Sequence, residues 1–533
     1  MFLITSAAYI GQEFSSEFGR LPPAFLPVGN RRLYRYHREV LPADERIVLS
    51  LPEEFALPEY DRRILEELNI EPLFLPEGLS LGESVICALN LLGHANGPIR
   101  ILHGDTLIYD LPTQAQDAIT LSPVDDNYAW AIYNHEQTPP LSQLQESDLV
   151  TRRAESVVNG YFSFSDARLL IQSITRARGN FIDGINRYAA LKPLTPIECQ
   201  EWFDFGHLHT YYRSKTHVST TRVFNQMAIQ NGVVQKRSHK QQKMRAEANW
   251  FASLPTTLKR FTPNFLGALD DDNQPGYAIE YLYLTSLNEM WVFGNLPAFV
   301  WRRIGAACLD FFKECRQHTA PANTEISAEK LFGEKTRERL AQFSTENQID
   351  LDQTWQLNGS AVPGLHQIAA EALAEIPKPE VGCVVHGDLC FSNILYDFRS
   401  QSIKVIDPRG LDTQDNLTIF GNPDYDLAKF AHSVVGRYDF IIAGYYQLKQ
   451  TNYQLEFTLP TTDTHDQVEA LFLTRSEEGL DRTEKQLLAM QIHLFLSMLP
   501  LHNDDNQRQM ALLANALRLY QRMKALPFAE PKA

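Results

Sequence analysis

The sequence of 533 residues is poor in cysteine, in long apolar runs and in positive charge. Its cysteines are scattered and form no C-x-x-C pair, so neither a disulfide framework nor a zinc site is indicated. No apolar run reaches the ~18 residues of a membrane-spanning helix, and no cationic stretch precedes Phe2, Leu3 and Ile4 as it would in a signal peptide. We therefore expect a cytoplasmic protein without a membrane span. We read the cysteines as small buried hydrophobes: Cys87, Cys199, Cys308, Cys315, Cys383 and Cys390.

Acidic residues outnumber basic ones, with 65 Asp and Glu against 49 Lys and Arg, and the formal net charge is −16. A sequence-independent nucleic-acid binder needs cations to replace condensed counterions, and a polybasic membrane anchor needs them at the lipid surface. We therefore expect no nucleic-acid partner and only a local phosphate site. At roughly 150 residues per domain, the length predicts two to four domains.

The first ~110 residues alternate short apolar runs with helix-like stretches. The runs at 2–4, 46–49, 73–75 and 99–102 are separated by roughly 20 to 40 residues, as in βαβ units. This half is expected to be α/β with a mostly parallel sheet.

The pattern changes near Ser219. An alternating segment from Val223 to Val234, broken by Asn231-Gly232, predicts a hairpin, and an amphipathic stretch from Gln241 to Leu254 predicts a helix. Beyond residue 296 the pattern is mostly helical. Apolar residues recur there at three- and four-residue spacing, including residues 487–499 and 507–523.

The most informative stretch is V-V-H-G-D-L-C-F-S-N-I-L at residues 384–395, followed by I-K-V-I-D ending at Asp407. Transfer of a γ-phosphoryl group needs an acceptor oxygen held in line, a carboxylate to take its proton, and Mg²⁺ to gather the phosphates. Asp388 is the candidate base, and Asn393 and Asp407 are the candidate metal ligands. The tripeptide H-G-D alone would favour a polar turn without a catalytic role. The whole pattern, with Asn393 and Asp407 at these spacings, is much rarer.

This pattern, H-G-D-x-x-x-x-N-x-L with an Asp fourteen residues after the Asn, resembles the aminoglycoside phosphotransferase and choline kinase family. The resemblance covers roughly residues 219–525 and implies a two-lobed, protein-kinase-like α+β domain that uses ATP and Mg²⁺. It further implies that Lys236, on a strand, grips the α- and β-phosphates, with Glu247 as its ion-pair partner. By themselves, a strand lysine and a helix glutamate are more often solvated surface groups.

Two further segments match that family's order. Ile279-Glu280-Tyr281-Leu282 resembles the segment that joins the lobes, so backbone groups near Glu280 and Leu282 are expected to take the adenine. The stretch from Pro423 to Lys429 resembles the start of a structural helix, where an Asp accepts backbone N–H groups. We expect a brace there rather than a catalyst.

The amino-terminal segment from Thr5 to Asn30 is similar to the sugar-phosphate nucleotidylyltransferase pattern L-A-G-G-x-G-T-R followed by P-K-x-L-L-P-V. Gly11 and Pro22 fit their places, and Gly11 is the expected nucleotide-binding glycine. The family's arginine and lysine, however, fall on Glu13 and Pro23.

Three later blocks resemble the same family in the correct order. They are L-H-G-D-T around Asp105, V-N-G-Y-F-S-F at 158–164, which resembles the strand lining the sugar pocket, and W-F-D-F-G around Asp204. The resemblance implies a doubly wound domain over residues 1–215, with Asp105 and Asp204 as an Mg²⁺ pair. Taken singly, each aspartate would be read as a turn or cap residue.

The missing cations bear on activity, because they offset the charge that builds up when a phosphate attacks a nucleoside triphosphate. An ion pair at about 4 Å in a partly screened site is worth on the order of 4 kcal/mol. Nearby Arg20, Arg31 and Arg32 are the candidate substitutes. Two readings stay open for this domain: a divergent transferase, and a module that only binds a ligand or dimerises.

The leading hypothesis is an ATP- and Mg²⁺-dependent kinase for a hydroxyl group of a sugar or amino alcohol. Its nucleotidyltransferase-like partner would activate the product with a second nucleoside triphosphate such as CTP or UTP, for surface (capsule) polysaccharide or head-group synthesis. The rival is a nucleotide-binding pseudo-enzyme that scaffolds an assembly. The aromatic residues Trp291, Trp301 and Tyr438 suggest a cage for an amine, although helical aromatics are more often core. A homodimer is expected only by analogy.

Overall fold

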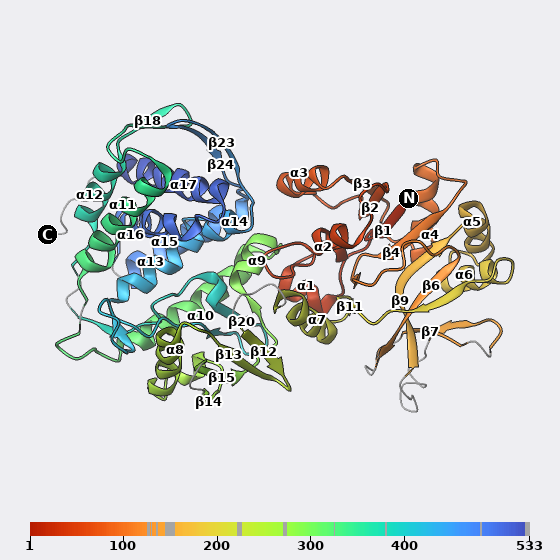
Figure 1. The fold of residues 1–533 in the computed structure, drawn as a ribbon, viewed down its shortest axis with the longest axis horizontal. Coiled ribbons are helices and arrows are strands. Elements are labelled where there is room, and N and C mark those ends of the chain that lie inside the picture. Colours follow the sequence, from red (N-terminus) through yellow and green to blue (C-terminus); the bar gives the residue numbers. More distant parts are fainter. Residues whose placement is uncertain are drawn as a thin grey trace. The chain divides into compact units, whose positions relative to one another are not determined.

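The computed structural model describes residues 1–124, 128, 130–134, 137–143, 155–220, 226–269, 274–324, 326–378, 381–479 and 482–527. The chain divides into two compact units (Figure 1). Unit 1 comprises residues 1–219 and 293–295, and unit 2 comprises residues 220–292 and 296–533. The boundary expected between residues 215 and 219 falls inside a helix, α7 (Leu208–Thr220). Within the described ranges, no helix combines the length and the apolar character needed to cross a membrane.

Unit 1 is a mixed α/β unit. Its strands are β1 (Phe2–Thr5), β2 (Ile47–Pro52), β3 (Ile70–Leu75), β4 (Ile99–His103), β5 (Thr106–Ile108), β6 (Ala118–Val124), β7 (Ala131–Tyr133), β8 (Leu141–Gln143), β9 (Glu155–Phe164), β10 (Thr195–Glu198) and β11 (Trp202–Asp204). Its helices are α1 (Gln12–Phe18), α2 (Leu33–Val40), α3 (Glu59–Glu67), α4 (Leu81–Leu91), α5 (Ala167–Arg176), α6 (Phe181–Ala189) and α7.

The strands predicted from the apolar runs form the parallel part of one large sheet. Its order is β10-β6-β9-β4-β1-β2-β3. β1 lies parallel to both β2 and β4, with Phe2 opposite Ile47 and Arg100, and β2 lies parallel to β3. β9 runs antiparallel to β4 and β6, so the sheet is mixed. The parallel arrangement expected for the first ~110 residues is therefore confirmed.

Helices α4, α5 and α6 lie beside the strands of this sheet (Figure 1). A continuous apolar cluster packs them against it. Apolar residues three and four apart on these helices put one stripe of each toward the strands. The cluster includes Val85, Ala88, Leu170, Ile174 and Ile185 from the helices and Leu3, Ile101 and Phe162 from the strands, each at most 1% exposed. Burying a side chain of this size contributes about 1.5–3 kcal/mol. The packing fixes the carboxyl end of β4, and Asp105 follows that end by two residues.

Unit 2 begins with a four-stranded antiparallel sheet in the order β12-β13-β15-β14. The strands are β12 (Gln226–Gln230), β13 (Val233–Arg237), β14 (Phe265–Leu269) and β15 (Gly276–Glu280), and α8 (Gln241–Ser253) packs against β14 and β15. Asn231 and Gly232 both have positive φ, as a tight hairpin turn requires. The predicted hairpin and helix are therefore confirmed, except that residues 221–225 lie outside the described residues.

The rest of unit 2 is rich in helices. They are α9 (Leu287–Phe293), α10 (Ala298–Arg316), α11 (Lys335–Asn347), α12 (Leu365–Glu375), α13 (Pro423–Val434), α14 (Tyr438–Ile442), α15 (Asp463–Gly479), α16 (Glu484–Met498) and α17 (Asn506–Ala525). Short strands accompany them: β16 (Thr285–Ser286), β19 (Cys383–Val384), β20 (Ile394–Asp397), β21 (Ser402–Val405) and β22 (Phe420–Gly421). Helices α16 and α17 carry the three- and four-residue spacing seen in the sequence.

One small sheet was not expected from the helical pattern beyond residue 296. It has the order β18-β17-β24-β23 and consists of β17 (Trp355–Leu357), β18 (Ser360–Val362), β23 (Gln447–Thr451) and β24 (Gln454–Thr458). The strands are short, and β17 pairs with β24 from about 100 residues away, so periodicity could not identify them. The turn signal Asn358-Gly359, both with positive φ, was present in the sequence.

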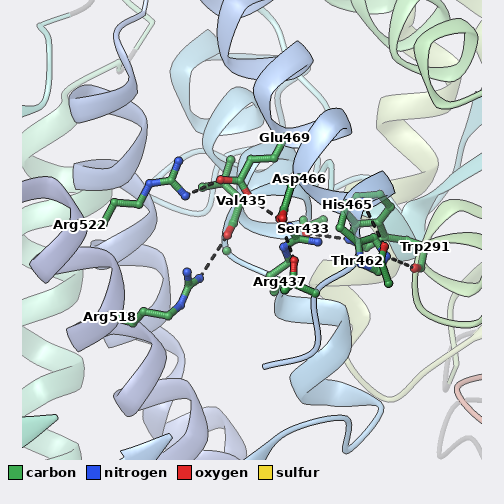
Figure 2. Close-up of polar contacts among 12 residues, drawn as sticks. Trp291, Ser433, Val435, Arg437, Thr462, His465, Asp466, Glu469, Arg518 and Arg522 are labelled. Carbon is green, nitrogen blue, oxygen red and sulfur yellow. Dashed lines mark hydrogen bonds and ion pairs between the residues drawn. The ribbon is translucent and has the colours of Figure 1, made fainter. Parts of the chain in front are cut away.

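An ion-pair network ties α15 and α17 to the segment between α13 and α14 (Figure 2). Arg437, only 5% exposed, pairs with Glu469 at 3.2 Å and lies over the ring of Trp291. Arg522 of α17 pairs with the other oxygen of Glu469. Trp291 and Trp301 are 1% and 5% exposed and pack edge to face. They are core residues, and the suggested amine cage is therefore wrong for both tryptophans.

Asp439 gives unit 2 a defined pH dependence. It is 5% exposed and, within the described residues, its Oδ2 atom has no hydrogen-bond partner. Burial raises the pKa of Asp439 from 3.8 to about 7. The folded state therefore holds this proton more tightly than the unfolded state, and stability falls as pH rises from about 4 to about 7.

We expect Asp439→Asn to raise the melting temperature at pH 8 and to change it much less at pH 5. The variant removes the cost of an ionised buried carboxylate, which at about 1.4 kcal/mol per pKa unit amounts to a few kcal/mol at most. Thermal melting of the full chain at both pH values measures the difference. An equal shift at pH 5 and pH 8 would contradict this role for Asp439.

Candidate functional site

The loop after β19 is held in one conformation by a buried carboxylate and a buried histidine. Asp426 of α13 accepts hydrogen bonds from the backbone N–H groups of His386 and Gly387 at 2.6 and 2.7 Å. The His386 ring donates from Nε2 to the Ile406 carbonyl at 2.9 Å, and its Nδ1 accepts the N–H of Asp388 at 3.3 Å. Burial lowers the pKa of His386 to about 4, so the ring is neutral at pH 7 and fills both roles.

Gly387 has a structural reason to be glycine. Its φ of 78° lies in the left-handed region, and a Cβ there would come within 2.7 Å of the Arg409 Cβ. The H-G-D motif therefore combines a conformational requirement with the acidic residue that follows it.

The start of α13 differs in detail from the expected brace. Asn422, not an aspartate, caps the helix, because its Oδ1 accepts the N–H of Asp424 at 2.9 Å. Asp424 instead forms a two-point ion pair with Arg482, at 2.8 and 3.1 Å. Asp426 does accept backbone N–H groups, but these belong to the 386–387 loop and not to its own helix.

Asp388 lies beside Asn393 and Lys429. The Asn393 side chain donates to the Asp388 carbonyl at 2.8 Å and lies 3.4 Å from its Oδ2. The Lys429 ammonium lies 2.9 Å from Asp388 Oδ1. Desolvation favours the neutral acid, but the charge and hydrogen bond of Lys429 outweigh it and lower the pKa of Asp388 to about 2. The side chain remains 43% exposed, so an ionised carboxylate is accessible from solvent.

Asn393 and Asp407 lie at the same end of the β20–β21 hairpin. Ile394 pairs with Val405, and the Ile406 N–H donates to the Asn393 carbonyl at 3.0 Å. Asp407 follows directly with a φ of 57°, a strained value for a residue other than glycine. The hairpin register therefore brings together the two residues predicted as metal ligands.

Lys236 joins the buried Glu247 and the half-exposed Asp407 in one chain of charges. Its ammonium lies 2.7 Å from Glu247 Oε2 and 2.9 Å from Asp407 Oδ1. Lys236 is 6% exposed and Glu247 is fully buried, and the Tyr277 hydroxyl also donates to Glu247 at 2.7 Å. Desolvation would lower the pKa of Lys236, but the two carboxylates raise it, so it stays charged. Lys236 and Glu247 are therefore not the solvated surface groups that a lone strand lysine and a lone helix glutamate usually are.

Glu280 and Leu282 are not among these contacts. Glu280 ends β15, opposite Val233, and its carboxylate accepts from the Asn264 side chain at 2.8 Å. The Leu282 carbonyl accepts the N–H of Leu284 at 2.8 Å. Glu280 is the last residue of β15, and Leu282 follows it before α9. Their predicted place between two lobes and their role toward adenine remain predictions.

Lys429 is the site residue that sequence reasoning missed. The sequence pattern places it only at the end of the bracing segment 423–429. One signal was available, because Asp426 and Lys429 are three residues apart and therefore share one face of a helix. That face contacts both the backbone and the carboxylate of the 386–388 loop.

Unit 1 contains a separate cavity of about 440 Å³. Asp105, Asp204, His103 and His207 line it together with Trp130 and Trp202, and β9 contributes Val158, Asn159, Gly160 and Phe162. β11 pairs antiparallel with β5, with Asp204 opposite Thr106, so the two aspartates predicted as a pair lie on one wall. The described lining residues include no lysine or arginine.

The two aspartates of this cavity are close enough to affect each other. A Cβ at Gly206 would lie 2.7 Å from Asp105 Oδ2 and 3.3 Å from Asp204 Oδ1. Desolvation and the charge of Asp204 raise the pKa of Asp105 to about 6. Asp204 Oδ2 accepts hydrogen bonds from His207, at 3.0 Å, and from Thr210.

Both predicted metal pairs have a donor chemistry that suits Mg²⁺. Within the described residues, no group of three or more His, Cys, Asp or Glu side chains is arranged as a metal site. Mg²⁺ commonly takes one or two carboxylates and completes its shell with waters and substrate phosphates. Asn393 with Asp407 and Asp105 with Asp204 each supply two oxygen-bearing side chains. A cation would offset both the burial of Asp105 and the charge of Asp204, which raise the pKa of Asp105.

The amino-terminal loop lacks the cations of the pattern it resembles. Gly11 precedes α1 with nothing within 4 Å of an added Cβ, so its surroundings do not require glycine. Glu13 is exposed in the first turn of α1.

The three arginines considered as substitutes are engaged elsewhere in unit 1. Arg20 pairs with Glu77 at 2.8 Å, Arg31 with Glu39 at 2.8 Å, and the buried Arg32 with Asp61 at 3.1 Å.

Comparison with known proteins gives likenesses in structure only. No family model and no curated protein matches the chain. Among solved structures, it is similar to a UDP-glucose pyrophosphorylase complexed with UDP-glucose (13% identity, TM-score 0.31, covering 42% of this chain and 98% of that chain). It is also similar to HddC from Yersinia pseudotuberculosis (16%, 0.30, 41% and 98%) and to the inositol-1-phosphate CTP transferase from T. maritima (13%, 0.31, 41% and 96%).

Proposed function

We propose that unit 2 is an ATP- and Mg²⁺-dependent kinase that phosphorylates a hydroxyl group of a sugar or amino alcohol. The observation that carries the proposal is the convergence of residues distant in sequence. Lys236 contacts Glu247 and Asp407 at 2.7 and 2.9 Å, and the hairpin that carries Asp407 also carries Asn393, which contacts Asp388. Phosphoryl transfer needs this combination of a phosphate-binding cation, metal ligands and a positioned carboxylate.

The roles of these residues follow from their contacts. Lys236, held by Glu247, presents its charge to the α- and β-phosphates, and backbone groups near Glu280 and Leu282 take the adenine. Asn393 and Asp407 would hold Mg²⁺, which supplies charge neutralisation at the phosphates. Asp388 orients the acceptor hydroxyl and accepts its proton as the oxygen bonds to the γ-phosphorus and ADP leaves.

For unit 1 we propose a nucleotidyltransferase-like role, in which the phosphorylated product is activated with a nucleoside triphosphate such as CTP or UTP. Asp105 and Asp204 would hold Mg²⁺ beside the cavity. Such products feed surface polysaccharide or head-group synthesis. A homodimer formed through this unit is part of the same proposal.

A second function for unit 1 is favoured by a specific observation. Glu13 and Pro23 occupy the positions of the expected cations, and Arg20, Arg31 and Arg32 are paired with other carboxylates. Glu13, exposed in the first turn of α1, places a negative charge at this loop, where the resembled pattern has an arginine. The alternative is therefore a unit that binds a small ligand in its cavity without transferring a nucleotide.

Product analysis distinguishes these functions. The full chain with Mg²⁺–ATP and a panel of choline, ethanolamine, glycerol, heptose and hexosamine should release ADP with one acceptor. Pyrophosphate release from CTP or UTP, with the phosphorylated product, would identify the transferase. ATP bound without ADP release with any acceptor would instead indicate a pseudo-enzyme scaffold.

If unit 1 is a transferase, Asp204→Asn should lower pyrophosphate release by at least about tenfold, because hydrogen bonds and ligand contacts to a charged group are worth about 1.5–3 kcal/mol. ADP release should stay unchanged. Asp388→Asn serves as the reciprocal control, with ADP release lost and pyrophosphate release from supplied phosphorylated acceptor retained. Loss of both activities in either single variant would contradict two independent sites.

A further inference from the structure

Lys429 is placed to act on the same reaction through Asp388. Its ammonium lies 2.9 Å from Asp388 Oδ1, and its side chain is 17% exposed. Among the residues that the structure describes, Asp388 is the one carboxylate within ion-pair distance of Lys429. Asn393 approaches the carboxylate from its other oxygen, at 3.4 Å. The carboxylate is therefore held from two sides, and its remaining surface is open to solvent.

The loop itself supplies no positive charge at this point. The sequence from His386 to Asn393 contains no lysine or arginine, and burial keeps His386 neutral. The nearest histidine on the helix, His432, is also buried, and its pKa is lowered to about 3 by desolvation and by Lys429. Lys429 is therefore the positively charged group that faces Asp388 from α13.

The position of Lys429 is fixed by the helix that carries it. Asp426, one turn earlier, accepts hydrogen bonds from the backbone N–H groups of His386 and Gly387. Helix α13 therefore contacts the loop through both Asp426 and Lys429. Desolvation would lower the pKa of Lys429, but the Asp388 carboxylate raises it above the ordinary value, so the ammonium stays charged. A fixed cation next to an ionised carboxylate is consistent with electrostatic preorganisation.

We propose that Lys429 is a positioning residue for phosphoryl transfer, which aims the Asp388 carboxylate at the acceptor hydroxyl and offsets its negative charge as the phosphoryl group arrives. The proposal rests on the kinase function proposed for unit 2. In the reaction, the acceptor oxygen bonds to the γ-phosphorus of ATP. The bond between the γ-phosphorus and the β-phosphate oxygen breaks, and ADP leaves with its electron pair. The hydroxyl proton passes to Asp388. Lys429 itself loses no proton.

The test compares turnover and nucleotide affinity in Lys429→Met, Lys429→Gln, Lys429→Arg, Asp388→Asn and the double variant Lys429→Met/Asp388→Asn. Lys485→Met is the matched control, because Lys485 is 13% exposed and pairs with Glu375 at 2.7 Å elsewhere in unit 2. Lys429→Met should lower kcat on the order of 10²-fold, as misplacement by about 1 Å does. The affinity for ATP should change by less than about threefold, and Lys485→Met should keep full turnover.

The other variants separate charge from packing. Lys429→Arg should recover part of the lost turnover because it keeps the charge. Lys429→Gln should not recover it, although its amide can still donate to Asp388, and it also replaces Lys429→Met if that variant fails to fold. If Lys429 acts through Asp388, the double variant should be no slower than Asp388→Asn alone.

Each contrary result overturns a distinct statement. Full turnover in both Lys429→Met and Lys429→Gln, or multiplicative losses in the double variant, would overturn the positioning role while leaving the kinase function intact. A loss of turnover in Lys485→Met equal to that in Lys429→Met would show that the Lys429→Met effect is only a loss of stability. No ADP release by the unmodified chain with any acceptor would overturn the kinase function and, with it, this inference.

Discussion

Asp388→Asn is expected to lower turnover by roughly 10² to 10⁴, the contribution attributed to a positioned acid–base group. The amide keeps the size and part of the hydrogen bonding of the carboxylate, but it cannot accept the proton of an acceptor hydroxyl. Asp388 does not contact Lys236 in the described structure, so the affinity for ATP should be largely unchanged. ADP release and calorimetric titration with ATP measure the two quantities on the same protein.

The control for this variant is its melting temperature. Asp388 is 43% exposed and its pairing with Lys429 is lost in the variant, so a modest destabilisation is expected. Retention of full activity would refute the assignment of Asp388 as the base. A loss of ATP affinity that matches the loss of turnover would show that Asp388 serves binding instead.

The second large effect is expected for Asp407→Ala, which should weaken the binding of Mg²⁺–ATP by about 10- to 100-fold. Contacts to charged groups are worth about 1.5–3 kcal/mol, and each 1.4 kcal/mol corresponds to a factor of ten. The change removes a predicted metal ligand and one of the two carboxylates that hold the Lys236 ammonium. Titration with ATP in the presence and in the absence of Mg²⁺ separates the two contributions.

Asp397→Ala is a suitable control because Asp397 ends β20 at the opposite end of the same hairpin, where it accepts from Ser400. It should leave nucleotide affinity unchanged. An unaltered affinity in Asp407→Ala, measured beside this control, counts against Asp407 as a metal ligand.

Local patterns were enough to predict the elements that surround the site. The apolar runs identified the parallel strands β1 to β4, and Asn231-Gly232 identified the hairpin that precedes Lys236. The spacing of Asp388, Asn393 and Asp407 indicated a candidate site, and a single hairpin carries the last two residues. In each case a short stretch of sequence contains the whole geometric relationship.

What the sequence could not show are relationships between distant segments. Asp426 accepts hydrogen bonds from a loop 39 and 40 residues earlier, and Lys429 pairs with Asp388, 41 residues earlier. Likewise, the pairing of Arg20 with Glu77 depends on tertiary structure that places residues 57 apart side by side. Burial also changed the expectation for Lys236 and Glu247, since a lone charged residue is usually solvated.

The most direct measurement of the central claim is a structure of the full chain with Mn²⁺ and a non-hydrolysable ATP analogue, with the metal located by its anomalous signal. We expect a metal peak beside the Asn393 and Asp407 side chains, the phosphates next to Lys236, and the γ-phosphoryl group facing Asp388. A nucleotide bound elsewhere on unit 2, or one bound with no metal beside Asn393 and Asp407, would contradict it.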